Sequence, residues 1–414
     1  METLGMYRVD HKTLTKLRAE IEHEIHHGIL PFWHTYSKDE ELGGFYGRVS
    51  DNGKAEPFAP KSLILNTRIL WSFSVAYATY GGLENLSLAD RAYEYITQYF
   101  LDEEFGGVYW ILDSRGNPVD DKKKVYGHAF LIYALSEYYG IKQEQSILDL
   151  AIETFRIVES HSFDRKNGGY FEAFQRDWTL TDDLRLSAID LNEKKSMNAH
   201  LHVLEAYTNL YRYWRDPALK EQLTRLIYDF SEKIFNSSTG HYQLFFNEVW
   251  DVKSDRISFG HDIEGSWLIC EAAQAIGDAD LIKISQQIAL IQASAVYLKG
   301  INDDGSLIYE IRSNGQRDRE RHWWAQSEAL VGFLNAYQLS SDQKYFNVAQ
   351  RLWEYIKHNL IDTRHGEWHY KRLANGEIAS NQFKISEWKG PYHNLRACIE
   401  LSKRLGSLIN EGSK

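Results

Sequence analysis

Histidine and glutamate occur close together in residues 258–267, which read Ser-Phe-Gly-His-Asp-Ile-Glu-Gly-Ser-Trp. If a helix begins near Gly260, His261 and Glu264 stand three residues apart and share one helix face. An imidazole beside a carboxylate can exchange protons at neutral pH, because the ordinary histidine pKa is about 6.5. The same pair at a helix start can also be a capping or surface arrangement, so the rest of the chain must decide between the two roles.

Histidines also occur in the preceding apolar helical stretch. Asn198 and His202 are four residues apart and share a helix face, which Glu205 continues. His200 is turned about 200° away, so we predict His202 in a functional site and His200 in packing. His128 opens another apolar run and is predicted to be structural. The spacing of His200 and His202 suits a metal-binding strand rather than a helix, and no second cluster has ligand spacing, so no metal is expected.

Composition limits the possible partners. The 414 residues carry a net charge of −11, which disfavours nucleic acid and anionic membranes. Residues 1–29 mix charges throughout, and we expect no stretch long enough to span a bilayer. Cys270 and Cys398 lie in apolar helical stretches and are predicted to be buried free thiols of a cytoplasmic protein. The aromatic content of 14% fits a cleft whose flat faces stack on sugar rings.

A glycine followed by aromatic and β-branched residues recurs along the whole chain, at intervals of 61 to 71 residues. Each copy is predicted to form a short β-hairpin around a turn such as Asp51-Asn52-Gly53 or Ser313-Asn314-Gly315. Self-similarity at a nearly fixed period indicates a repeat architecture. The copies are marked by Gly44, Gly107, Gly169, Gly240, Gly305 and Gly366.

Two helical stretches separate each hairpin from the next. In the first interval, apolar residues recur at helical spacing from Leu63 to Val75, Gly81-Gly82 interrupts them, and Leu88 to Phe100 resumes the pattern. An opening helix at Val9 to Gly28 and a closing helix at Tyr392 to Leu405 complete the set. The sequence therefore predicts twelve helices in six pairs.

Six helix pairs favour an all-α fold, the (α/α)6 barrel, with residues 1–414 as a single domain and the hairpins at one rim. An open superhelix of pairs is the alternative, but it gives no reason to stop at six. The helix after each hairpin is predicted to lie in the inner layer, because it begins with polar and aromatic groups unsuited to an outer surface. These helices are parallel, so their starts should meet at one pocket. The groups concerned are Asn66 and Arg68, Tyr126 and His128, Asn198 to His202, His261 and Glu264, Trp323 to Glu328, and Trp388 and His393.

Four segments at these helix starts resemble the signature sequences of a known enzyme family. The segments are Lys195 to His202, Gly260 to Glu264, Trp323 to Gln326 and Trp388 to Asn394. They are similar to those of cellobiose 2-epimerases, within the N-acylglucosamine 2-epimerase superfamily. The likeness extends from about Asn66 to Ala397. The family's (α/α)6 fold agrees with the repeat count.

The resemblance implies reversible inversion at C2 of the reducing-end sugar of a β-1,4-linked disaccharide, converting cellobiose to glucosyl-mannose and lactose to epilactose. It implies that His261 and His393 are the general acid/base pair and that Glu264 assists one of them. Arg68 and His202 would surround the sugar oxygens. The resemblance also implies substrate contacts from Tyr126, Asp190 and Asn198, and aromatic walls from Trp388 and from either Trp323 or Trp324.

Such a reaction opens the sugar ring, removes the C2 proton to give an enediolate, and returns a proton on the other face. Two imidazoles can do this, while Arg68 stabilises charge on oxygen and neutral His202 donates a hydrogen bond there. Glu264 is expected to raise the basicity of His261 and hold its tautomer. No cofactor is expected, because the open-chain aldehyde is the electron sink. The predicted partner of this monomeric chain is a small disaccharide.

Three other functions fit parts of the sequence. An aldose-ketose isomerase acting on mannose-type monosaccharides would use the same enediolate and return the proton to C1. A glycoside hydrolase would use paired carboxylates, and the candidates are Asp190, Glu205, Asp262, Glu264 and Glu328. A non-catalytic sugar-binding barrel would keep the tryptophan walls without needing the histidines. The histidines at the predicted rim favour the epimerase over the last two.

Overall fold

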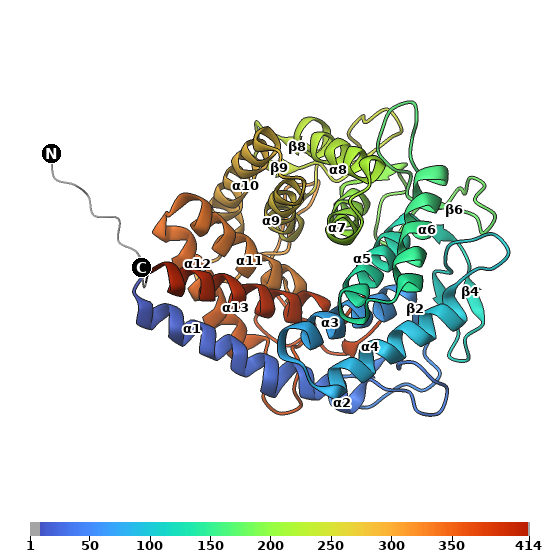
Figure 1. The fold of residues 1–414 in the computed structure, drawn as a ribbon. Helices are drawn as coiled ribbons and strands as arrows, with labels where there is room; N and C mark the ends of the chain where they lie inside the picture. Colours follow the sequence, from blue (N-terminus) through green and yellow to red (C-terminus); the bar gives the residue numbers. More distant parts are fainter. Residues whose placement is uncertain (1–8, 413–414) are drawn as a thin grey trace.

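The computed structural model describes residues 9–412, which form two concentric layers of helices (Figure 1). The inner layer consists of α3 (Leu63–Tyr80), α5 (Val125–Lys142), α7 (Met197–Tyr213), α9 (Phe259–Ile276), α11 (Trp323–Ser340) and α13 (Tyr392–Gly412). Each inner helix contacts the next, and α13 contacts α3, so the ring closes. The predicted (α/α)6 barrel is confirmed, and the open superhelix is excluded.

The outer layer alternates with the inner one along the chain. It consists of α1 (His11–Glu24) with η1 (Ile25–Ile29) and α2 (Leu30–Tyr36), α4 (Leu83–Tyr95) with η2 (Ile96–Phe100), α6 (Gln145–His161), α8 (Pro217–Asp229) with η3 (Phe230–Ile234), α10 (Ala279–Gly300) and α12 (Gln343–Asn359). In Figure 1 the first outer helix lies beside α13, the last inner one, and the two are in contact.

Burial explains the layer that each helix takes. In α3 every residue from Leu63 to Ala76 is buried, which requires neighbours on all sides. In α12 the buried residues recur at helical spacing, from Tyr345 through Phe346, Val348 and Ala349 to Ile356, and so form one stripe. Cys270 and Cys398 lie buried within the inner layer and are free thiols, as predicted.

The first and last helices are longer than predicted. The opening helical segment continues past Gly28 to Tyr36, because the π-turn of η1 accommodates the glycine and Pro31 stands at the start of α2, where a proline is tolerated. At Gly28 a Cβ atom would lie 2.4 Å from an oxygen of Glu24, so the glycine makes room for a buried carboxylate. The closing helix extends to Gly412 rather than Leu405.

Short strands at the hairpins connect neighbouring repeats. The strand before each inner helix pairs with a strand of the following repeat, and the last such strand pairs with β1, so these contacts also run around the ring. The pairs are β2 (Lys61–Ser62) with β3 (Ile111–Leu112), β5 (Lys123–Lys124) with β6 (Ala173–Phe174), β7 (Lys195–Ser196) with β10 (Phe245–Phe246), β11 (Ile257–Ser258) with β12 (Glu310–Ile311), β14 (Arg321–His322) with β15 (Lys371–Arg372), and β16 (Phe383–Ile385) with β1 (Val49–Ser50).

The predicted hairpins are present within these connections. The strands β4 (Pro118–Asp120) and β13 (Arg317–Asp318) fold back on β3 and β12, and β8 (Phe235–Asn236) pairs with β9 (His241–Tyr242). Four of the described strands are followed by a single antiparallel bridge in place of a full return strand, namely Val49 with Ala55, Phe174 with Leu180, Phe246 with Val252, and Arg372 with Ile378.

Buried lysine–aspartate pairs fix the starts of four inner helices. The lysine lies in the strand before the helix, and its ammonium group contacts an aspartate at the preceding glycine turn. With the charges paired and hydrogen-bonded, burial is tolerated, whereas removing one partner would leave a buried charge. The pairs are Lys61–Asp39 at 2.8 Å, Lys123–Asp102 at 2.7 Å, Lys195–Asp164 at 2.8 Å and Lys384–Asp362 at 2.6 Å.

The expectation that no stretch is long enough to span a bilayer was wrong for one helix. Helix α10 has 22 residues with a mean hydropathy of 1.2 over its best 18-residue window, which meets the requirement of length and composition alone. In the fold it packs in the outer layer against α9, with 44% of that window buried. Its apolar length therefore serves packing within the barrel.

Glu24 is expected to couple stability to pH. Its Oε1 accepts a hydrogen bond from Trp368 Nε1 at 2.9 Å, and burial raises its pKa from 4.5 to about 8. Because the folded state holds this proton more tightly, the group's stabilisation is present below its unfolded pKa and is lost as the pH rises to about 8. We expect Glu24→Gln to lose less stability than the parent between about pH 5 and pH 8, measured by urea unfolding.

The exposed Glu84→Gln is the matched control for this measurement, since its side chain is 82% exposed. It should keep the parental dependence of unfolding free energy on pH. If Glu24→Gln kept that dependence too, Glu24 would not be the source of it.

Candidate active site

A cavity of about 330 Å³ lies at the rim where the inner helices begin. Helices α3, α5, α7, α9, α11 and α13 each contribute to its lining, and so does the loop around Asp190. A larger hollow of about 850 Å³ lies on the outside, between α1 and α12, away from the six helix starts. Of the other polar groups expected at the helix starts, Asn66, Gln326 and Glu328 do not line the smaller cavity. Every residue that the family resemblance implied for the site does line it: Arg68, Tyr126, Asp190, Asn198, His202, His261, Glu264, Trp323, Trp324, Trp388 and His393.

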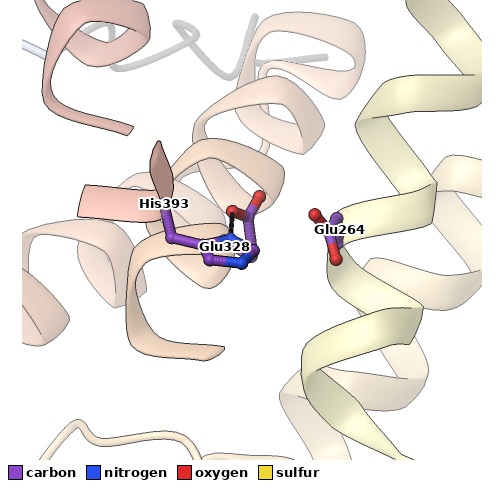
Figure 2. Close-up of side chains that lie close together, drawn as sticks. All are labelled: Glu264, Glu328 and His393. Carbon is purple, nitrogen blue, oxygen red and sulfur yellow. Dashed lines mark hydrogen bonds and ion pairs between the residues drawn. The ribbon is translucent and has the colours of Figure 1, made fainter. Parts of the chain in front are cut away.

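His393 is held by a carboxylate. Its Nδ1 lies 2.7 Å from Glu328 Oε1, a contact that Figure 2 shows as a dashed line. The ionised carboxylate can only accept, so Nδ1 carries the proton and Nε2 is left with a lone pair. Burial lowers the pKa of His393 well below its ordinary value, and the charge of Arg68 lowers it further. His393 is therefore a neutral imidazole at the cavity wall.

His202 is arranged in the same way. Its Nδ1 lies 2.9 Å from Glu205 Oε2, one helical turn further along α7. Burial lowers the pKa of His202 and outweighs the hydrogen bond to Glu205. Its ring also makes an edge contact with Tyr126, with centroids 4.8 Å apart. His202 is thus neutral and fixed in orientation. Its single N–H is donated to Glu205, so Nε2 is an acceptor, and the prediction that His202 donates a hydrogen bond to a sugar oxygen was wrong.

His261 has a different partner from the one expected. We predicted that Glu264 would hold its tautomer, but His261 Nδ1 lies 2.8 Å from Ser258 Oγ. Glu264 Oε1 instead accepts a hydrogen bond from Arg396 at 2.8 Å. Residue 261 lies beside the strand that precedes the helix, whereas residue 264 lies one turn deeper and faces α13. Burial lowers the pKa of His261 to about 3.

One arginine joins three carboxylates beneath the cavity. Arg396, on α13, forms ion pairs with Glu205, with Glu264 at 2.8 Å and with Glu328 at 2.7 Å. The Tyr392 hydroxyl also donates to Glu205. The arginine is 1% exposed, so it connects α7, α9 and α11 within the interior of the barrel.

The three carboxylates ionise differently. Burial opposes ionisation of Glu205, but Arg396 and His202 outweigh it and lower its pKa to about 2. Burial raises the pKa of Glu328, although its hydrogen-bond donors Arg396, His393 and Trp267 Nε1 oppose that rise and favour its ionised form. Burial raises the pKa of Glu264 well above its ordinary value, and the charge of Glu328 raises it further. Glu264 is therefore the member that carries a proton at neutral pH.

Arg68 and Tyr126 form a second polar side of the cavity. The guanidinium donates to the backbone carbonyl of Trp388 and, at 3.1 Å, to the Tyr126 hydroxyl. Asn198 Oδ1 is buried and has no hydrogen-bond partner among residues 9–412, so it is available to a ligand. Asp190 turns its carboxylate into its own loop, where Oδ2 accepts from the backbone and the hydroxyl of Ser187.

Tryptophans line the remaining wall. The ring of Trp324 lies between two histidines, with centroid distances of 4.8 Å to His261 and 5.7 Å to His393. Trp388 contacts Tyr126 at 6.1 Å. Trp323 is 2% exposed and packs on Tyr370, so Trp324 is the better placed of the two adjacent indoles to face a ligand. The cavity therefore combines flat apolar faces with neutral imidazoles.

A model of the family described as N-acylglucosamine 2-epimerase matches residues 44–397. The chain belongs to the N-acylglucosamine 2-epimerase family. It is 45% identical to a cellobiose 2-epimerase of Bacteroides fragilis over 93% of this chain and 98% of that one, and 42% identical to one of Dictyoglomus turgidum over 95% and 100%. A solved cellobiose 2-epimerase from Bacillus thermoamylovorans shares 41% identity and superposes with a TM-score of 0.90, covering 94% of this chain and 100% of that one. Membership of this family makes the protein a carbohydrate epimerase, which is an isomerase.

A solved D-mannose isomerase shares the fold at a TM-score of 0.80 and 22% identity, with 96% of this chain and 99% of that one covered. At this identity the likeness concerns the fold alone. The carbohydrate epimerases named above are much more similar to the chain.

One cluster of side chains at this site has the residue types that commonly bind a metal ion. Within the described residues, ligand atoms of Glu264, Glu328 and His393 lie within 4.8 Å of one another. However, the Arg396 guanidinium already bonds to both carboxylates, and His393 turns its Nδ1 to Glu328 (Figure 2). A permanent cation thus fills the place between the two acids, and the donor set does not suit a metal.

Two histidines outside the site confirm their predicted structural roles. His128 Nδ1 bonds to Lys124 O at 2.8 Å, and its Nε2 accepts from Val108 N. His200 makes the equivalent contacts one repeat later, with Ser196 O at 2.6 Å and Tyr170 N at 2.9 Å. Each imidazole joins an inner helix to the hairpin before it. The same arrangement therefore occurs in two successive repeats.

Sequence reasoning missed several residues of the site. His322, Tyr309 and Tyr370 line the cavity from the hairpins, and Leu186, Ser187 and Ile189 line it from the long loop before β7. The position of His322 immediately before Trp323 was a usable signal. Arg396 could have been found from its spacing, because it lies three residues after His393 and so shares its helix face.

Proposed function

We propose that the protein catalyses the reversible C2 epimerisation of the reducing-end sugar of β-1,4-linked disaccharides, such as cellobiose to glucosyl-mannose and lactose to epilactose. The observation that most directly supports this proposal is that His261 and His393 both contact the Trp324 indole in one cavity. The identity of 45% to a cellobiose 2-epimerase over most of both chains supports the choice of disaccharide.

The first step of the proposed reaction opens the sugar ring. A base accepts the proton of the C1 hydroxyl while an acid gives a proton to the ring oxygen, and the aldehyde forms. Neutral His202 and His393 each present an Nε2 lone pair that can accept this proton. Glu264 lines the same cavity and carries a proton, so it can donate to a sugar oxygen.

The second step removes and returns the proton at C2. One of His261 and His393 accepts the C2 proton, and the electron pair moves onto the C1 oxygen to give an enediolate. The other histidine must be protonated at this stage and gives its proton to the opposite face of C2. When it is His393, this proton is the one accepted from the C1 hydroxyl during ring opening. Arg68 is permanently cationic and can stabilise the developing charge on oxygen. The Trp324 and Trp388 rings provide flat faces for the two sugar rings.

Incubation with cellobiose in heavy water tests this function. We expect glucosyl-mannose and recovered cellobiose to carry deuterium at C2 of the reducing-end sugar, detected by NMR and mass spectrometry. A disaccharide ending in a ketose would instead indicate an aldose-ketose isomerase, and free glucose would indicate a hydrolase. Either of those as the main product would overturn the proposal.

The same proposal includes the organisation of the active unit. We propose that the chain acts as a single catalytic domain, as a monomer in the cytoplasm, and without a cofactor, since the open-chain aldehyde accepts the electrons. Sedimentation at the concentration used for assay measures the oligomeric state directly.

A further inference from the structure

Ser258 occupies a capping position without capping the helix. It directly precedes α9, and its hydroxyl makes no hydrogen bond to the backbone of the first turn. The equivalent serine of α7, Ser196, accepts a hydrogen bond from Ala199 N at 3.1 Å. That of α3, Ser62, accepts from Leu65 N at the same distance. Among these three related serines, only Ser258 gives up the stabilising cap.

The hydroxyl of Ser258 makes a hydrogen bond with His261 instead. Ser258 Oγ lies 2.8 Å from His261 Nδ1, and this serine is 6% exposed. The serine itself is held in β11, where it pairs with Glu310 of β12. The backbone that carries the hydroxyl is thereby fixed by a ladder shared with the next repeat, and the imidazole is anchored to it.

This partner distinguishes His261 from the other two cavity histidines. His202 and His393 each turn Nδ1 to a carboxylate, which can only accept a hydrogen bond and which stabilises an imidazolium through its charge. A hydroxyl accepts or donates and carries no charge. An imidazolium formed at His261 therefore keeps its Nδ1–H···Oγ hydrogen bond but gains no ionic stabilisation from that partner.

The surroundings of His261 add little compensating charge. The titratable groups that act on it are His202, Glu328 and Arg256, and the Trp324 ring covers one side. Burial is the main cause that lowers its pKa. Glu328, the one carboxylate in this set, is itself paired with Arg396 and His393.

We propose that Ser258 is a positioning residue for His261, which holds the ring during proton transfer while leaving the imidazolium a strong enough acid to return its proton to carbon. The inference rests on the proposed epimerase function. In one direction of the reversible reaction, Nε2 of His261 gains the proton from C2 while the other histidine protonates the opposite face. In the reverse direction, Nε2 of the protonated His261 gives a proton to C2, and in both directions Nδ1–H donates to Ser258 Oγ. No proton leaves Ser258, and the charge on the ring is removed when carbon is reprotonated.

Substitutions at position 258 test this role through kcat, KM and their pH dependence with cellobiose. We expect Ser258→Ala to lower kcat at least tenfold with little change in KM, and Ser258→Thr, which restores a hydroxyl, to recover most of the loss. Ser258→Asp should move the pH limb assigned to His261 to higher pH, because a carboxylate stabilises the imidazolium. Ser196→Ala is the matched control: it loses a real cap, so its melting temperature should fall while kcat and the pH profile stay parental.

Nitrogen NMR of protein labelled at histidine separates this inference from the proposed function. The His261 signals, identified by their loss in His261→Gln, should change tautomer or mobility in Ser258→Ala and remain parental in Ser196→Ala. Parental kcat, pH profile and His261 signals in Ser258→Ala would overturn the role of the serine. If the parent protein did not epimerise cellobiose, the proposed function would fail, while the NMR comparison would still test the contact.

Discussion

Replacing His393 by asparagine should lower kcat for epimerisation by at least about a thousandfold, because general acid/base transfer alone contributes on the order of 100 to 10,000-fold. The asparagine can still accept or donate a hydrogen bond near Glu328, but it cannot carry a proton to or from carbon. We expect the same scale of loss for His261→Asn. Product formation from cellobiose measures the rate, and circular dichroism with thermal unfolding measures the fold.

His200→Asn is the control for these two variants. His200 is fully buried and bridges Ser196 O and Tyr170 N, outside the cavity. Its loss should lower the melting temperature and leave kcat of the folded protein near the parental value. Near-parental rates in both His393→Asn and His261→Asn would remove the two imidazoles from the mechanism, even if epimerisation itself were observed.

Isotope exchange refines the same prediction. If the two histidines serve opposite faces of C2, a variant lacking one of them can still exchange the C2 proton through the other without inverting the centre. We therefore expect at least one of the two variants to incorporate deuterium at C2 of recovered cellobiose faster than it forms the epimer. Equal loss of exchange and inversion in both variants would favour a single group acting on both faces.

The sequence was sufficient for the architecture and for the cavity residues at the inner helix starts, but not for those that the hairpins and the loop before β7 contribute. The glycine–aromatic repeat predicted six hairpins and twelve helices, and the polar groups at the inner helix starts predicted where the side chains meet. Both predictions depend on the periodicity of residue types, which can be read directly from the sequence. The helix ends at Tyr36 and Gly412 were less predictable, because a π-turn at Gly28 preserved a helix that a glycine and a proline would ordinarily end.

The partners of the side chains were not predictable in the same way. The spacing of His261 and Glu264 placed them on one helix face. It did not reveal that His261 would bond to Ser258 and Glu264 to Arg396, rather than to each other. Arg396 is 132 residues from Glu264 and 191 from Glu205, and only ring closure brings them together. Local spacing thus identified which residues reach the cavity, while their hydrogen bonds depended on helices from distant repeats.

Arg396→Met is expected to cause the largest loss of stability, about 3–5 kcal/mol, because it leaves buried carboxylates without their cation. In the parent, Arg396 contacts Glu205, Glu264 and Glu328, and Glu264 is already protonated. The variant therefore leaves two ionised acids that must either stay charged without a partner or take up protons. Urea unfolding of the two proteins at several pH values measures the difference in unfolding free energy.

The loss should depend on pH in a defined direction. The pKa of Glu205 is lowered to about 2 in the parent, so its stabilisation is present above the unfolded pKa and disappears as the pH falls through the folded value. In the variant that contribution is absent. Its absence matters less below about pH 4.5, because protonation of the carboxylate in the unfolded chain then reduces the contribution in the parent too. The difference between parent and Arg396→Met should thus be largest above about pH 4.5 and shrink as the pH falls from about 4.5 toward about 2.

Two further variants separate loss of charge pairing from loss of packing. Adding Glu205→Gln and Glu328→Gln to Arg396→Met removes the unpaired charges and should recover much of the unfolding free energy without restoring epimerisation, because His202 and His393 then lose their carboxylates. Arg404→Met, on the same helix, removes an arginine paired at 3.4 Å with Glu271 and should cost less. If Arg396→Met lost equal stability at every pH and the added substitutions recovered none of it, the arginine would act by filling space. The expected pH-dependent loss with partial recovery would instead mean that one buried cation keeps the carboxylates of Glu205 and Glu328 ionised, each beside a neutral histidine of the same cavity.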